Sequence, residues 1–307
     1  MGQFGERAGV VALVGFLAVD VLLVGFAINS TRQPVAAGGT TVTSSPVTTP
    51  KPSASSSTTT KAPAVKVVPL TVGLVPVDGQ SALRFSTGTC KDGGAVLELT
   101  SNAGKTWGPK AAPFDAISRL RLRSNGSAFV VGGNTSSDCT FSIRQADAVD
   151  ADFGDASEVS DAWYRDLRSQ GSVGVPAGGS KKPCGGSSVV DLAVKGTEAV
   201  VLCADGRLRT SETGSVWADG DRAAGALAIG LGSGDKVLAV IPGVGDCKGL
   251  AVVDSAKAGS ALGCVATDLA DVEAGTVAIA TAGDATWLRV GDDTYRAGSA
   301  LKAWKKS

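Results

Sequence analysis

The chain has 307 residues, of which 43% are hydrophobic and only 5% aromatic, with 41 glycines and no histidine. This composition favours a β protein with many turns, and it excludes Ser-His-Asp and Cys-His catalysis as well as histidine-based metal sites. The formal net charge is zero. A globular part without excess positive charge gives no sign of nucleic-acid binding.

Residues 8–28 form an apolar run that only Asp20 interrupts. As a helix this run would be about 31 Å long, close to the thickness of a bilayer core. We expect residues 1–28 to be a short cytoplasmic stub and an uncleaved transmembrane anchor. A cleavable signal peptide is the alternative, but residues 26–34 contain no clean cleavage site. Asp20 is either a tolerated acid or a contact for another membrane helix.

Residues 29–66 differ sharply in composition from the rest of the chain. Ser, Thr and Pro account for 21 of these 38 residues, and Leu, Ile and aromatic residues are absent. Such a segment buries too little apolar surface to offset the entropy of ordering it. We expect a disordered linker that holds residues 67–307 away from the membrane.

Residues 67–307 consist of short Val, Leu and Ile-rich runs that are separated by turn signals. Residues 117–124 show the period of a strand, because leucines alternate there with arginines. The turn signals lie at 77–80, 124–127, 195–198, 232–235 and 282–285. We expect five hairpin-containing units and an all-β domain.

Tryptophans give a second measure of the repeat. Trp107, Trp163, Trp217 and Trp304 lie near the ends of units of about 40 to 55 residues. A period of this length with three or four strands per unit is typical of a β-propeller. We therefore predict a β-propeller of about five blades, with a β-sandwich as the alternative.

Two octapeptides share a pattern, TSNAGKTW at 100–107 and TSETGSVW at 210–217, and SALKAW at 299–304 is an eroded third copy. They resemble the Asp-box, or BNR repeat, of sialidase-type propellers and of propellers related to photosystem II assembly factors. Both full copies lack the defining Asp. The matching residues are Thr100, Asn102, Gly104, Thr106 and Trp107 in the first copy, and Thr210, Glu212, Gly214 and Trp217 in the second.

The resemblance implies that each octapeptide forms the turn from the third to the fourth strand of a blade. There the polar third residue holds the turn and the tryptophan inserts between sheets, so the role is structural. The low Lys and Met content beside abundant Ala, Gly and Val indicates a bacterial source of high GC content, as in actinobacteria.

Six cysteines follow the predicted anchor, and an even number in an exported chain predicts three disulfides. Fifteen pairings are possible in principle. The propeller that the resemblance implies narrows them, since it brings certain loops together. The predicted pairs are Cys90 with Cys139, Cys184 with Cys203, and Cys247 with Cys264. We predict no metal site and no cofactor.

The same loops carry one aspartate in each predicted unit. They emerge on one face of a propeller, the face at which most propellers bind ligands. One hypothesis is an acidic rim that attracts cations or basic partners; the alternative is that these residues only form turns. The five residues are Asp92, Asp138, Asp205, Asp246 and Asp292.

Three functional classes are open for such a domain. A sialidase-like glycoside hydrolase would need a tyrosine nucleophile and an arginine triad, by resemblance, but Tyr164 and Tyr295 stand in no family motif. Other glycosidases need only two carboxylates. We favour a non-catalytic, membrane-tethered propeller outside the cytoplasm that binds a protein, a peptide or a cell-envelope polymer. Cytoplasmic scaffolding would require six reduced thiols.

Overall fold

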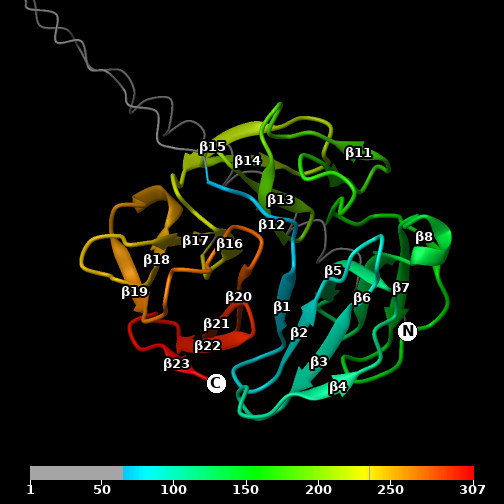
Figure 1. Cartoon of the computed structure of the whole chain (residues 1–307), viewed down its shortest axis with the longest axis horizontal. Coiled ribbons are helices and arrows are strands. Elements are labelled where there is room, and N and C mark those ends of the chain that lie inside the picture. Colours follow the sequence, from blue (N-terminus) through cyan, green and yellow to red (C-terminus); the bar gives the residue numbers. More distant parts are fainter. Residues whose placement is uncertain (1–64, 235) are drawn as a thin grey trace, which may run out of the picture. The chain divides into compact units, whose positions relative to one another are not determined.

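Six small antiparallel sheets follow one another along residues 65–234 and 236–307, the part of the chain that the computed structural model describes. Five sheets have four strands each and the third has three. The sheets stand around a common axis (Figure 1). The chain is therefore an all-β propeller with six blades, so the prediction of about five is wrong and a β-sandwich does not describe the domain.

Blades 1 to 3 take up the first half of the described chain. Blade 1 contains β1 (Val72–Pro76), β2 (Ala82–Ser86), β3 (Val96–Thr100) and β4 (Gly108–Lys110). Blade 2 contains β5 (Ala116–Leu122), β6 (Ala128–Gly133), β7 (Ser142–Ala146) and β8 (Ser157–Glu158), with the 3₁₀ helix η1 (Thr135–Ser137) between β6 and β7. Blade 3 contains β9 (Tyr164–Arg165), β10 (Val173–Gly174) and β11 (Ser180–Lys181).

Blades 4 to 6 complete the ring. Blade 4 contains β12 (Val189–Lys195), β13 (Glu198–Cys203), β14 (Arg207–Ser211) and β15 (Ala218–Arg222). Blade 5 contains β16 (Ala228–Leu231), β17 (Val237–Pro242), β18 (Leu250–Asp254) and β19 (Ala261–Val265), with the 3₁₀ helix η2 (Ser255–Lys257) after β18. Blade 6 contains β20 (Val277–Ala282), β21 (Ala285–Val290), β22 (Asp293–Gly298) and β23 (Lys305–Lys306).

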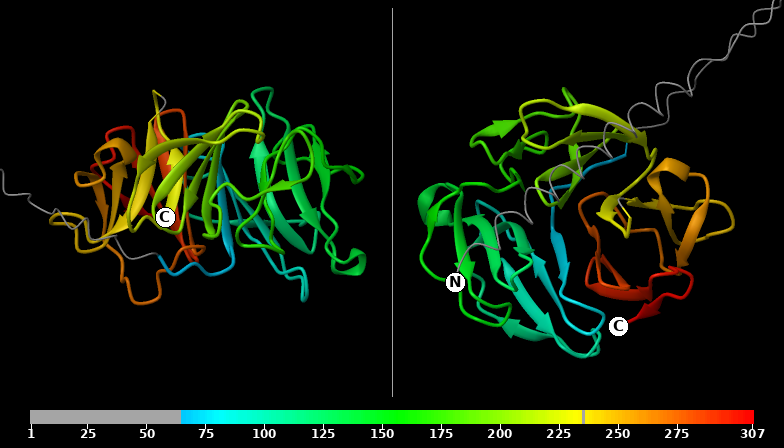
Figure 2. Two further views of the ribbon diagram at one scale, coloured as in Figure 1. Left: turned by 90° about the horizontal axis from the view of Figure 1, so that it is seen from above. Right: turned by 180° about the vertical axis from the view of Figure 1, so that it is seen from behind.

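The innermost strands form a closed circle. Each contacts the next in the order β1, β5, β9, β12, β16, β20 and back to β1, and Figure 2 shows the resulting disc from the side and from behind. Residues before β1 help to close it, because the amide of Val68 donates to the carbonyl of Ala274 at 2.9 Å and that of Thr71 to Gly275 at 2.9 Å. Blades 6 and 1 are thus joined by main-chain hydrogen bonds.

The two ends of the ring differ in their loops. In each complete blade the second strand turns into the third at the end that we call the disulfide face, and all six cysteines lie at or near this end. The other end, the turn face, carries the turns from first to second and from third to fourth strand. The strands of each blade pair in chain order, so successive turns alternate between the two faces.

The apolar core lies between neighbouring blades. Its largest cluster joins blades 4, 5 and 6, and includes Leu202, Leu250 and Leu288. A second cluster joins blades 1 and 2 around Leu83 and Ile117. Burying both faces of each sheet against its neighbours is what makes the blades stable together and not singly.

Blade 3 is the blade that sequence patterning missed. Its three strands have two residues each, which is too short for a hydrophobic alternation to show. Trp163 was expected near the end of a unit but directly precedes β9, and so begins a blade. The hairpin patterns of the other five blades fall where we predicted them.

Blade 3 also lacks a counterpart of the first, innermost strand of the other blades. The turn from β9 to β10 lies at the disulfide face, because Gln170 accepts a hydrogen bond from Val189, the first residue of β12. The turn from β10 to β11 lies at the turn face, where Val175 packs against Gly214. Strands β9 to β11 therefore correspond to strands 2 to 4 of the other blades, and β9 takes the innermost position.

The predicted membrane helix and nearly all of the predicted linker lie outside the described residues. Within residues 65–234 and 236–307, no helix has the length and hydrophobicity to cross a membrane.

Candidate functional site

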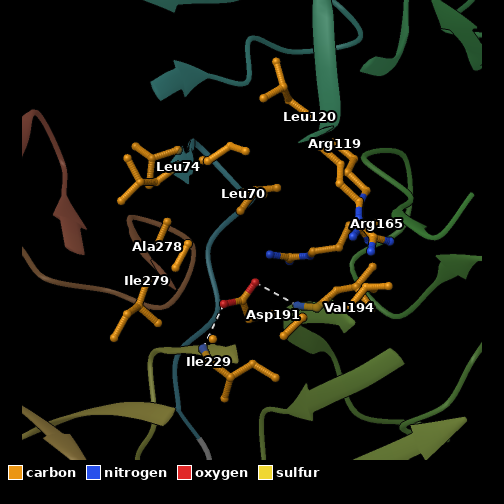
Figure 3. Close-up of a pocket in the computed structure, with 18 of the residues that line it drawn as sticks. Leu70, Leu74, Arg119, Leu120, Arg165, Asp191, Val194, Ile229, Ala278 and Ile279 are labelled. Carbon is orange, nitrogen blue, oxygen red and sulfur yellow. Dashed lines mark hydrogen bonds between the residues drawn. The ribbon is translucent and has the colours of Figure 1, made fainter. Parts of the chain in front are cut away.

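A cavity of about 300 Å³ runs along the axis of the ring. All six blades line it, almost entirely through their innermost strands. Figure 3 shows apolar residues from β1 and β20 on one side, including Leu74 and Ile279, and Arg119, Arg165 and Asp191 on the other. The channel is therefore the first place to look for a binding site.

The two walls of the channel have different chemistry. Strands β1, β16 and β20 contribute Val, Leu, Ile, Ala, Gly and Pro, with Thr281 as their polar residue. Every charged residue that lines the cavity comes from β5, β9 or β12. These charged residues are Arg119, Arg121, Arg165 and Asp191.

Arg119 comes from the middle of β5. The pairing of β5 with β6 shifts between Ile117 and Arg119, and a bulge of this kind re-aims the side chains that follow it. One guanidinium nitrogen of Arg119 donates to the carbonyl of Trp163 at 3.0 Å. Burial and the nearby Arg121 lower the pKa of Arg119 to about 9, and Asp191 opposes this shift.

Arg165 ties blade 3 to blade 4. Its two terminal nitrogens donate to the carbonyls of Val190 at 2.7 Å and Val189 at 2.9 Å, and its own carbonyl accepts a hydrogen bond from Ser118. The residue is only 6% exposed, and burial lowers the pKa of its guanidinium. Because β9 is the innermost strand of blade 3 and contacts β12, Arg165 reaches β12 directly.

Asp191 ties blade 4 to blade 5. One carboxylate oxygen accepts from its neighbour Leu192 at 2.7 Å, and the other accepts from the amide of Ile229 at 2.9 Å. The pairing of β12 with β13 shifts just before Asp191, so a bulge precedes this residue as it does Arg119. Burial raises the pKa of Asp191, although both hydrogen bonds and the nearby arginines oppose the shift.

Sequence patterning placed Arg119 and Arg121 on one face of a strand, yet it gave them no role. It missed Arg165 and Asp191 as site residues altogether. A signal for Arg165 exists, since Trp163 and Arg165 recur as Trp287 and Arg289, each pair two residues apart. Nothing in the sequence places these side chains at a common axis.

The predicted aspartates lie in loops of five different blades at the disulfide face, and they do not converge on the channel. Asp205 is paired with Arg207 at 2.8 Å. Burial opposes its ionisation, but hydrogen bonds from Arg207 outweigh that effect and lower the pKa. Asp92 and Asp246 have lysines close by in sequence. The acidic rim is thus interrupted by positive charge, and its binding role stays a prediction.

All three disulfides form in the predicted pairs. Cys90 with Cys139 links the β2–β3 loop to the β6–β7 loop, and so blade 1 to blade 2. Cys184 with Cys203 links the chain that leaves blade 3 to β13. Cys247 with Cys264 lies within blade 5.

The octapeptide at 100–107 joins β3 to β4, as expected. The side-chain oxygen of Asn102 accepts from the amide of Thr106 at 3.0 Å, and the Thr100 hydroxyl accepts from the amide of Gly104 at 3.1 Å. Gly104 has a φ of 82°, which favours glycine. Trp107 packs edge-on against Trp287 of blade 6, with ring centroids 6.3 Å apart.

The octapeptide at 210–217 joins β14 to β15 by a different arrangement. The hydroxyl of Ser211, and not that of Thr210, accepts a hydrogen bond from the amide of Gly214 at 2.8 Å. Glu212 is exposed and does not hold the turn. Trp217 packs edge-on against Trp163 of blade 3 at 5.6 Å. The two copies therefore share a location and a tryptophan contact but differ in their hydrogen bonds.

No family model matches the chain, and no curated protein matches its sequence. The relation to the Asp-box family therefore stays a prediction. In residues 65–234 and 236–307, no three acidic or cysteine side chains gather as metal ligands.

Several solved structures show a loose likeness. One is described as YCF48 bound to D1 peptide, with 12% identity and a TM-score of 0.39 over 80% of this chain and 84% of that one. YCF48 from Cyanidioschyzon merolae has 16% identity and a TM-score of 0.38 over 80% and 88%. A computationally designed protein, Ika8, has 12% identity and a TM-score of 0.38 over 80% and 89%. At these scores the likenesses say nothing about function, and the propeller is defined by its own ring of sheets.

Proposed function

We propose that the chain is a non-catalytic binding propeller, held outside the cytoplasm by its N-terminal helix and linker, that binds a protein, a peptide or a cell-envelope polymer. One observation carries the non-catalytic part. Asp191 is the single carboxylate among the residues that line the channel, and both of its oxygens already accept main-chain amides. Glycoside hydrolysis commonly needs two carboxylates that flank the bond to be cleaved.

The surface favours a protein or peptide over a polysaccharide. Sugars are commonly held on exposed aromatic rings. Trp163 and Trp287 are buried, at 3% and 0% exposure, and the other three tryptophans are partly buried. Three disulfides at the disulfide face suit an oxidising compartment, which supports the external location.

The function can be tested by cross-linking on the full chain in its native cells. A photoreactive residue replaces Asp292, whose side chain is fully exposed in the β21–β22 loop of the disulfide face. The matched control replaces the exposed Asn125, in the β5–β6 turn of the turn face. We expect a discrete cross-linked partner from position 292 and none from position 125.

The catalytic alternative has its own outcome. Purified full chain is incubated with a panel of chromogenic glycosides, together with the variant Asp191→Asn. We expect no turnover by either protein. Turnover that Asp191→Asn abolishes would show that the channel is an active site and would overturn the proposal.

A further inference from the structure

The channel holds more positive than negative charge. Three arginines line it against one carboxylate, which leaves two net positive charges when Asp191 is ionised and three when it is protonated. Charge that is withdrawn from water without a partner is costly. An anion in the channel would relieve that cost.

Two of the arginines have donors to spare. Arg119 uses one nitrogen on the carbonyl of Trp163, and Arg121 uses one on the carbonyl of Gly196 at 3.3 Å. Their remaining nitrogens are not among the buried, unpaired polar atoms of the described residues, so they stay accessible along the cavity that both residues line. Planar guanidinium groups of this kind suit oxyanions, because they present paired N–H donors.

Arg165 and Asp191 are occupied in comparison. Arg165 donates hydrogen bonds from both terminal nitrogens to carbonyls of β12, and both oxygens of Asp191 accept hydrogen bonds from main-chain amides. They hold blades 3, 4 and 5 together. The open part of the charged wall is therefore formed by Arg119 and Arg121.

The wall across the channel is aliphatic. Leu74, Ala278 and Ile279 lie on it in Figure 3, and β1, β16 and β20 contribute no charged residue to the lining. A cavity of about 300 Å³ is at the lower end of the range for small-molecule sites. It suits a small ligand with an anionic head and an aliphatic body.

We propose that the channel binds an aliphatic oxyanion, with its carboxylate or phosphate head on Arg119 and Arg121 and its hydrocarbon body against β1 and β20. The inference rests on the non-catalytic binding function proposed above and names a ligand class for the axis of the ring. Carboxylate and phosphate share the chemistry that two guanidinium groups recognise, and the test separates them.

The test uses the full chain in lipid nanodiscs and isothermal titration calorimetry, with empty nanodiscs as the blank for partitioning. The probes are octanoate, octyl phosphate, 1-octanol and octylamine. At least one oxyanion should bind 10-fold or more tightly than octanol, and octylamine should not bind. Shortening octanoate to hexanoate should weaken binding by about fourfold per methylene if the aliphatic wall is used.

Variants locate the head group. Arg119→Gln with Arg121→Gln should weaken oxyanion binding by about 10- to 100-fold, as expected for hydrogen bonds to charged groups, and leave octanol unchanged. The control is Arg123→Gln, because Arg123 follows the same strand but is exposed and donates to Gln145 at 2.6 Å. It should bind like the wild type.

Several outcomes would overturn the inference. They are no oxyanion binding by the wild type, binding of both octanoate and octyl phosphate no tighter than that of octanol, or equal losses in the double variant and in Arg123→Gln. The wild-type comparison of the two oxyanions with octanol tests the inference even if the double variant does not fold. Failure here with a partner still cross-linked at position 292 would leave the proposed function intact, whereas glycoside turnover would remove that function.

Discussion

The seam between blades 6 and 1 and the seam between blades 3 and 4 are built from the same parts. In the first, Trp287 donates to the carbonyl of Asp78 at 2.9 Å and packs on Trp107. In the second, Trp163 donates to the carbonyl of Thr197 at 2.9 Å and packs on Trp217. In both seams the accepting carbonyl belongs to the first turn of the following blade.

The arginines two residues later show where the seams differ. Arg289 donates to the carbonyl of Phe85 at 2.7 Å, on β2, and lies away from the channel. Arg165 donates to β12, an innermost strand, and lines the channel. The loss of one inner strand from blade 3 thus turns a residue of a sealed seam into a residue of the channel wall.

The largest expected effect comes from removing a disulfide. The links Cys184–Cys203 and Cys247–Cys264 span 19 and 17 residues, so chain entropy alone gives each about 3 kcal/mol. Cys184 and Cys203 are both buried, whereas Cys264 is exposed. We expect alanine at 184 and 203 to lower the free energy of unfolding more than alanine at 247 and 264, as measured by urea denaturation. Equal losses would mean that blade 3 does not depend on its link.

An effect of intermediate size is expected when Arg289 and Arg165 are each replaced by methionine. Arg289→Met removes the hydrogen bonds that Arg289 donates to the carbonyls of Phe85 and Gly291 in a site where Arg289 is only 2% exposed, and should cost about 2 to 3 kcal/mol. Arg165→Met should cost about 1 kcal/mol, because the lost hydrogen bonds are partly offset by the removal of a buried charge. Arg289 differs in having a carboxylate, that of Asp292, at 3.8 Å. Thermal unfolding of both variants measures the difference. A larger loss for Arg165→Met would contradict the view that its buried charge offsets part of what its hydrogen bonds contribute.

The smallest effect concerns the two octapeptide turns. Asn102→Ala removes the acceptor for Thr106 and should cost about 1 kcal/mol. Glu212→Ala should change stability by less than about 0.5 kcal/mol, since a surface substitution away from such features is usually neutral. The melting temperatures of the two variants test this. A loss at Glu212 as large as at Asn102 would show that the second turn follows the family pattern after all.

Five of the six blades could be predicted because their strands are long enough to show alternation and because turn residues separate them. The disulfide pairs followed once the loops of a propeller were placed on one face. Blade 3 could not be predicted, since two-residue strands such as Tyr164–Arg165 carry no period. The residues of the channel could not be predicted either, because bulges and the geometry of the ring bring Arg119 and Asp191 to it.

The central claim is that residues 164–181 form a blade that lacks an inner strand and closes the ring. Hydrogen–deuterium exchange on the full chain, read by mass spectrometry, tests it most directly. The account predicts slow exchange across Tyr164–Arg165 and Val173–Gly174, which pair with each other, at rates nearer to those of the complete blades than to those of an unstructured peptide. Exchange of this whole segment as fast as an unfolded chain would contradict it.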